Sequence, residues 1–195
     1  NDAYICSLIR QDSVEEFIAY VNRTNISLSS QISPSIFETN SFLIQKRASL
    51  IEYATFFGSI QIIQFLRYSK VSLTSSLWLY AVHSNNGEII HFLEENEIKP
   101  EIEQDVTYGD IYKESIKCHH NAMANYIGDN FLDQVNDHSI KSYIIEYYNY
   151  NYFPTDIASL ISKPPDIDQM HHEPKDTLHR INNKKIFKGF HISDL

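Results

Sequence analysis

The sequence predicts an all-α fold, a solenoid in which antiparallel helix pairs stack one behind another. Short amphipathic segments with helical periodicity recur along the chain, and the segment at 49–66 returns downstream in altered form. Each predicted helix is shorter than the roughly 12 to 15 residues at which an isolated helix is marginally stable in water. Neighbouring pairs must therefore supply the missing apolar contacts, as they do in repeat proteins.

The unit at 49–68 shows the pattern most clearly. Ser49 has a hydroxyl group that can accept a hydrogen bond from the free N–H groups of a helix start. Gly58 separates two apolar stripes, which consist of Leu50, Ile51 and Ala54 before it and Ile62, Ile63 and Leu66 after it. We therefore expect two antiparallel helices, joined at Gly58, that face a shared interior.

Two further units follow at 76–96 and 110–128. A shift of 27 residues takes Ser49 onto Ser76, and a further shift of 34 takes Ser76 onto Asp110. Ser and Asp both favour the N-cap position, so we expect each of these three residues to begin the first helix of its unit. The unequal shifts indicate an acidic, solvated insertion before Asp110.

Less regular segments complete the predicted repeat domain, which spans residues 1–160. Residues 2–22 predict a first helix pair with a turn at 11–13, and residues 138–150 predict a further partial unit. From 161 to 195 the period is lost, and we expect a weakly ordered tail or a segment that docks on the last layer.

The segment at 23–47 is rich in Ser, Asn and Thr. A structureless connection of this length is unusual in a compact domain. We therefore expect a helical turn or two at 35–45, packed by Phe37 and Phe42.

Composition limits the function. The net charge of −9 disfavours nucleic acid as a partner, because such binding needs clustered Lys and Arg. Two cysteines, Cys6 and Cys118, provide no disulfide framework and suit a reducing, cytoplasmic location. No apolar run approaches the length of a membrane span, so we expect no membrane partner. Because the chain begins with Asn1 rather than Met, we expect it to be a piece of a longer protein.

The unit at 49–68 resembles the ankyrin repeat, whose consensus is roughly T-P-L-H-x-A-A, two variable residues, G-H-x-E-I-V and a Leu pair. The matching residues are Ser49 at the Thr, Ile51 at the Leu, Ala54 at the first Ala, Gly58 at the Gly, Gln61 at the Glu, and Ile62 and Ile63 at the Ile-Val pair. Leu50 and Glu52 replace the proline and the histidine. The chain is thus similar to the divergent ankyrin-type proteins that are expanded in certain protists.

The resemblance also implies a function and a site. Ankyrin proteins bind other proteins through a concave face, which includes the two variable positions before the Gly. In the three units these positions are Phe56 and Phe57, His83 and Ser84, and Lys117 and Cys118. Phe56 and Phe57 are large aromatics at expected surface positions, so they need either a partner or a cover from residues 23–47.

Catalytic and metal chemistry are the rival hypotheses. Cys118, His119 and His120 are metal-ligand types in a row, but adjacent helical residues diverge by about 100°, and a turn between paired helices explains all three. No phosphate loop, dinucleotide fingerprint or nucleophile motif occurs. We therefore expect no enzyme activity, cofactor or metal, and an unidentified protein as partner. Two alternatives stay open: a purely structural segment of a longer array, and a histidine-dependent metal-binding module.

Overall fold

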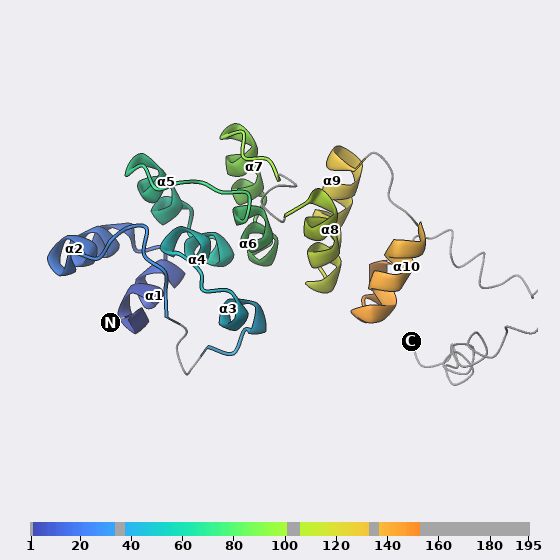
Figure 1. The fold of residues 1–195 in the computed structure, drawn as a ribbon, viewed down its shortest axis with the longest axis horizontal. Helices are drawn as coiled ribbons and strands as arrows, with labels where there is room; N and C mark the ends of the chain where they lie inside the picture. Colours follow the sequence, from blue (N-terminus) through green and yellow to red (C-terminus); the bar gives the residue numbers. More distant parts are fainter. Residues whose placement is uncertain (1, 34–37, 101–105, 133–136, 153–195) are drawn as a thin grey trace, which may run out of the picture. The chain divides into compact units, whose positions relative to one another are not determined.

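The computed structural model describes residues 2–33, 38–100, 106–132 and 137–152, and every named element within these ranges is a helix (Figure 1). The predicted all-α class is therefore confirmed. An isolated antiparallel bridge joins Gln31 and Ser49. The predicted tail at 161–195 and the side chain of Phe37 lie outside the described residues. None of the described helices combines the length and apolar character that crossing a bilayer requires.

Successive helices pack in pairs, with the first helices of neighbouring pairs in contact. The elements are α1 (Asp2–Arg10), α2 (Val14–Thr24), α3 (Ser41–Gln45), α4 (Leu50–Phe57), α5 (Ile60–Tyr68), α6 (Leu77–Ser84), α7 (Gly87–Glu95), α8 (Tyr108–Lys117), α9 (Asn121–Phe131), α10 (Asp137–Glu146) and the 3-10 helix η2 (Tyr150–Tyr152). The pairs are α1 with α2, α4 with α5, α6 with α7, and α8 with α9. Helix α4 also contacts α1 and α6, and α8 contacts α6 and α10.

A left-handed residue recurs in the turn after the first helix of each pair. The residues are Asp12 (φ 49°), Gly58 (74°), Asn85 (49°) and His119 (60°), and Tyr148 (57°) holds the same place after α10. In four of these turns the next backbone N–H donates back to a carbonyl of the helix, as from Ser59 to the Ala54 carbonyl at 2.9 Å, whereas the Asn86 N–H donates to Ser84 Oγ. This turn satisfies carbonyl groups at the helix end that would otherwise lack partners.

The side chain after this left-handed residue reaches the preceding unit. Three such bonds join Ser59 Oγ to the Ile9 carbonyl at 2.6 Å, His120 Nδ1 to the Val82 carbonyl at 2.7 Å, and Asn149 Nδ2 to the Ile116 carbonyl at 2.8 Å. The three acceptors all lie close to the end of a first helix. The same hydrogen bond therefore links consecutive units at three places, with three different donor residues.

Two of the three predicted N-caps are wrong. Ser49 caps α4 as predicted, through a reciprocal capping box with Glu52. Ser76 forms no side-chain cap and instead donates from Oγ to Glu52 Oε1 at 2.7 Å. Asp110 is not a cap either, because α8 begins earlier: Thr107 is its N-cap, and the Asp110 carboxylate accepts the Thr107 backbone N–H at 2.9 Å.

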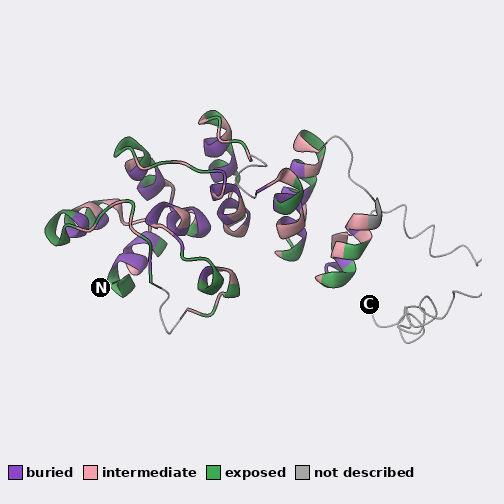
Figure 2. Ribbon diagram, viewed as in Figure 1, coloured by how far each residue is buried: buried purple, intermediate pink, exposed green. Residues whose placement is uncertain are grey.

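The apolar stripes that the sequence predicts form the core between the helices (Figure 2). Fully buried side chains include Ile62, Ile63 and Leu66 of α5, and Ile89 and Leu93 of α7. Small residues at the same place on three first helices, Ala54, Ala81 and Ser115, are also fully buried and permit close helix packing. Trp78 is also buried, and its indole N–H donates to the Ile98 carbonyl at 2.7 Å.

Candidate functional site

The six predicted partner-binding residues lie at the C-terminal ends of α4, α6 and α8. Three of them come together across these helices. The ring of Phe56 stacks on that of His83 with centroids 4.9 Å apart, and Cys118 Sγ lies 3.4 Å from His83 Nδ1. Ser84 instead makes local bonds, donating to the Ala81 carbonyl at 2.7 Å. Lys117 is half-exposed.

Helix α3 covers part of this surface. Phe42, from the segment that we expect to contain a helical turn, has its ring centroid 6.1 Å from Phe56, 5.0 Å from Tyr80 and 4.3 Å from His83. Phe56 is consequently only 9% exposed, and its expected place on the surface is wrong. The reason is a tertiary contact: Phe42 of α3 packs against the Phe56 ring, so a residue of the 23–47 segment provides the cover that is the alternative to a partner.

Phe57 differs from its neighbour, because 37% of it remains exposed. The Arg10 guanidinium carbon lies 5.1 Å from the Phe57 ring centroid, within the range of a cation–π contact. Arg10 is held there by Tyr53, whose hydroxyl accepts its Nε–H at 2.7 Å, and by Glu38 at 3.3 Å. An aromatic face and a positioned guanidinium group thus reach the solvent together.

A polar cluster lies beside this surface. His83 Nε2 is 3.0 Å from Glu114 Oε1, and Lys117 Nζ lies 3.0 Å from the same oxygen. Burial alone would raise the pKa of Glu114, but hydrogen bonds from His83 and Lys117 outweigh it and lower the pKa. Burial, aided by the negative charge of Glu114, raises the pKa of Cys118 to about 12.

The order Cys118, His83, Glu114 matches the roles of nucleophile, base and orienting carboxylate in a catalytic triad. A nucleophilic cysteine, however, requires a lowered pKa and a positive surrounding. Cys118 has the opposite, a raised pKa next to a carboxylate. The arrangement therefore favours a neutral thiol over nucleophilic catalysis.

The two histidines that follow Cys118 form hydrogen bonds outside the cluster of His83, Glu114 and Cys118. His119 Nε2 lies 2.9 Å from the Tyr147 carbonyl, and His120 bonds to the Val82 carbonyl. In both residues a ring nitrogen contacts a backbone carbonyl. A structural role in the turn between paired helices therefore accounts for His119 and His120. The later histidines at 171, 172 and 179 lie outside the described residues.

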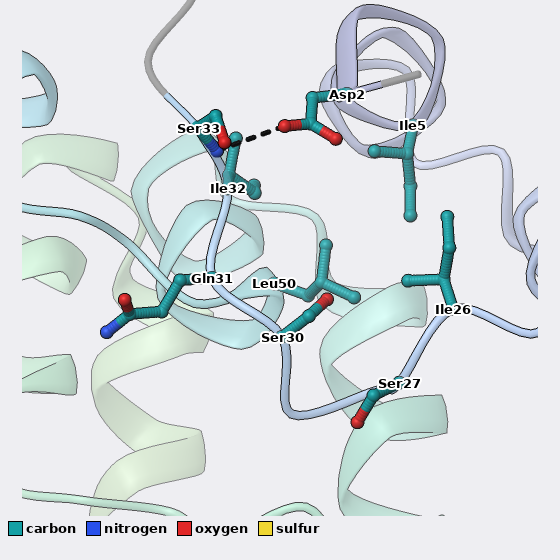
Figure 3. A pocket seen from close by; sticks show the side chains of 9 residues that line it. All are labelled: Asp2, Ile5, Ile26, Ser27, Ser30, Gln31, Ile32, Ser33 and Leu50. Carbon is teal, nitrogen blue, oxygen red and sulfur yellow. Dashed lines mark hydrogen bonds between the residues drawn. The ribbon is translucent and has the colours of Figure 1, made fainter.

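A cavity of about 340 Å³ lies at the other end of the described repeats, between α1 and the loop at 26–33. Apolar side chains and several serines line it, and the Ser33 backbone N–H donates to the Asp2 carboxylate at 3.2 Å (Figure 3). Its lining contains no His, Cys or Lys. It therefore gathers neither a metal-ligand set nor an acid–base pair.

Arg10, Phe42 and Glu114 belong to the site, although the sequence patterns above do not place them there. Two signals were available. Arg10 ends α1 just as Phe56 and Phe57 end α4, so extending the unit alignment to the first pair would have found it. Glu114 precedes Cys118 by four residues and therefore shares its face of the helix.

Comparison of the chain with family models, with curated proteins and with solved structures finds no match in any of the three.

Proposed function

We propose that the chain is an ankyrin-like solenoid that binds another protein through the ends of its first helices. The repeated left-handed turn and the repeated bond to the preceding unit support the solenoid, because they recur at equivalent places despite different residues. Contacts of α4 with α1 and α6, and of α6 with α8, bring equivalent positions of neighbouring units close together. A protein partner can then contact several units at once.

The exposure of Phe57 beside Arg10 is the observation that supports this function best. Aromatic and arginine side chains are enriched among the residues that dominate binding energy at protein interfaces. Phe57 occupies the variable position that ankyrin proteins use, and the ordered Arg10 side chain costs little further entropy on binding. The proposed contact surface consists of Phe57 and Arg10, with Lys117 at the end of α8, which is the first helix two units further along.

A reducing, cytoplasmic location belongs to the same proposal. Both cysteines are free thiols, one buried in α1 and one beside His83. Persistent free thiols are typical of compartments in which disulfides do not form. The net charge of −9 continues to disfavour nucleic acid as the partner.

Affinity capture with matched variants tests the proposal. Phe57→Ala should remove a specific partner from the captured set, or weaken its binding about tenfold or more, while costing roughly 1 kcal/mol of folding stability. Tyr68→Ala is the matched control, because Tyr68 is the most exposed described aromatic at 77% and lies at the end of α5.

Phe56→Ala separates binding from packing. Phe56 is buried beneath Phe42, so its truncation should lower the free energy of unfolding by about 3 to 5 kcal/mol. If Phe57→Ala and Tyr68→Ala recover the same proteins as the unmodified chain, the binding proposal fails. The structural-segment alternative would then remain.

A further inference from the structure

We propose that His83, Glu114 and Cys118 form a zinc site that joins α6 to α8. One donor atom from each of the three side chains lies within 4.8 Å of the other two. His83 Nε2 is 3.0 Å from Glu114 Oε1 and 3.9 Å from Cys118 Sγ. The proposal does not depend on the protein-binding function, because none of the three ligands belongs to the contact surface proposed above.

The spacing of the donors suits a tetrahedral ion. Zinc bonds of 2.0 to 2.3 Å place neighbouring ligand atoms roughly 3.4 to 3.8 Å apart. The distances from His83 Nε2 to Glu114 Oε1 and to Cys118 Sγ, 3.0 and 3.9 Å, bracket that range, so small side-chain rotations suffice. Glu114 and Cys118 are one helical turn apart, which is the spacing that places two ligands of a zinc helix on one face.

The donor chemistry selects the metal. An imidazole nitrogen, a carboxylate oxygen and a thiolate sulfur form a mixed set that zinc accepts, whereas magnesium and calcium require oxygen ligands. Three protein ligands leave the fourth position for water or a further ligand. Zinc binding also displaces the thiol proton of Cys118, so the bound form contains a thiolate.

The surroundings hold the histidine in place. The rings of Phe42 and Phe56 lie 4.3 and 4.9 Å from the His83 ring, and the His83 and Glu114 side chains are only 11% and 14% exposed. An apolar shell of this kind restricts water and orients a metal ligand. Lys117 contacts Oε1 and Oε2 of Glu114 at 3.0 and 3.1 Å, so it can keep Oε2 when the metal takes Oε1.

Cobalt(II) provides a spectroscopic probe, since it occupies zinc sites and reports both geometry and ligand type. Titration of the chelator-treated full chain should give the visible bands of a four-coordinate ion and a near-ultraviolet thiolate-to-cobalt band, saturating at one cobalt per chain. Zinc should displace the cobalt and raise Tm, because the metal binds the folded state. Absence of the thiolate band at saturating cobalt would overturn the proposal.

Variants assign the ligands. Cys118→Ser should abolish the thiolate band, whereas Cys6→Ser, which changes the other cysteine, should retain it. His83→Gln and Glu114→Gln should each weaken cobalt binding at least about tenfold, with folding checked by circular dichroism. Lys117→Ala should keep or strengthen binding, because it removes a competing positive charge. A band that survives in Cys118→Ser, or an affinity unchanged in both His83→Gln and Glu114→Gln, contradicts the assignment.

The test also separates this site from the histidines at 171, 172 and 179. Those residues can bind cobalt through imidazole nitrogen, but they cannot produce a thiolate band. Cobalt binding without that band would therefore refute the site at His83, Glu114 and Cys118.

Discussion

At the scale of single residues, one backbone conformation is repeated while the residue type changes. Asp12, Gly58, Asn85 and His119 all have positive φ at the turn that follows a first helix. Glycine adopts this conformation without steric cost, and Asn and Asp adopt it more readily than other residues. The sequence predicts the turn at Gly58 from the glycine itself, whereas the turn at His119 follows only from the alignment of the units, because histidine gives no local signal.

Gly58→Ala tests the conformational requirement. An added Cβ would find its nearest neighbour, Asn86 Nδ2, at 3.6 Å, which is an ordinary contact, so the cost comes from the backbone at φ 74°. We expect the free energy of unfolding to fall by about 1 to 2 kcal/mol, measured by urea denaturation. Gly58→Asn is the matched control and should cost less, because Asn85 already occupies this turn position. Equal losses for both variants would refute the backbone explanation.

The predicted site shows the same limit of residue-scale reasoning. Alignment of the units places His83 and Lys117 at equivalent positions and Cys118 at the next one, and the side chains of His83 and Cys118 do lie together. The burial of Phe56 could not be derived this way, because Phe42 reaches it from a short helix outside the repeats. A contact of this kind depends on the path of an irregular segment, for which helical periodicity gives no information.

At the scale of helices, the apolar periodicity predicts the paired helices well and their first residues less well. The prediction for α8 places its cap at Asp110, three residues too late, because the alignment assumes that first helices have equal lengths. Helix α8 has 10 residues, whereas α4 and α6 each have 8. The pair Thr107 and Asp110, spaced as in a capping box, is the local signal that identifies the start.

Removal of the α4 cap tests the importance of these helix starts. Ser49→Ala deletes the acceptor for the Glu52 backbone N–H, and we expect a loss of about 1 kcal/mol in the free energy of unfolding. Ser13→Ala is the control, since Ser13 precedes α2 without a side-chain cap bond. If thermal and urea denaturation show equal losses for the two variants, the capping box does not stabilise α4 as described.

At the scale of the described repeats, each pair is too small to bury its own apolar stripe and relies on its neighbours. Between units, contacts join α1 to α4, α4 to α6, α6 to α8, and α8 to α10. Stability in such an array is approximately a sum of terms for each unit and each interface. This distribution explains why binding residues can be placed at repeated positions without disturbing a single central core.

Site-specific photo-crosslinking tests the proposed protein-binding surface most directly. A photoreactive phenylalanine analogue is placed at position 57, beside Arg10. A second preparation has the analogue at position 68 as the control, because Tyr68 is exposed but lies on α5, the second helix of its pair. In native extract, irradiation should join position 57 to a discrete protein, and addition of the unmodified chain should suppress that product. If position 57 gives no crosslink, or crosslinks no more specific than those at position 68, the ends of the first helices do not bind a partner as proposed.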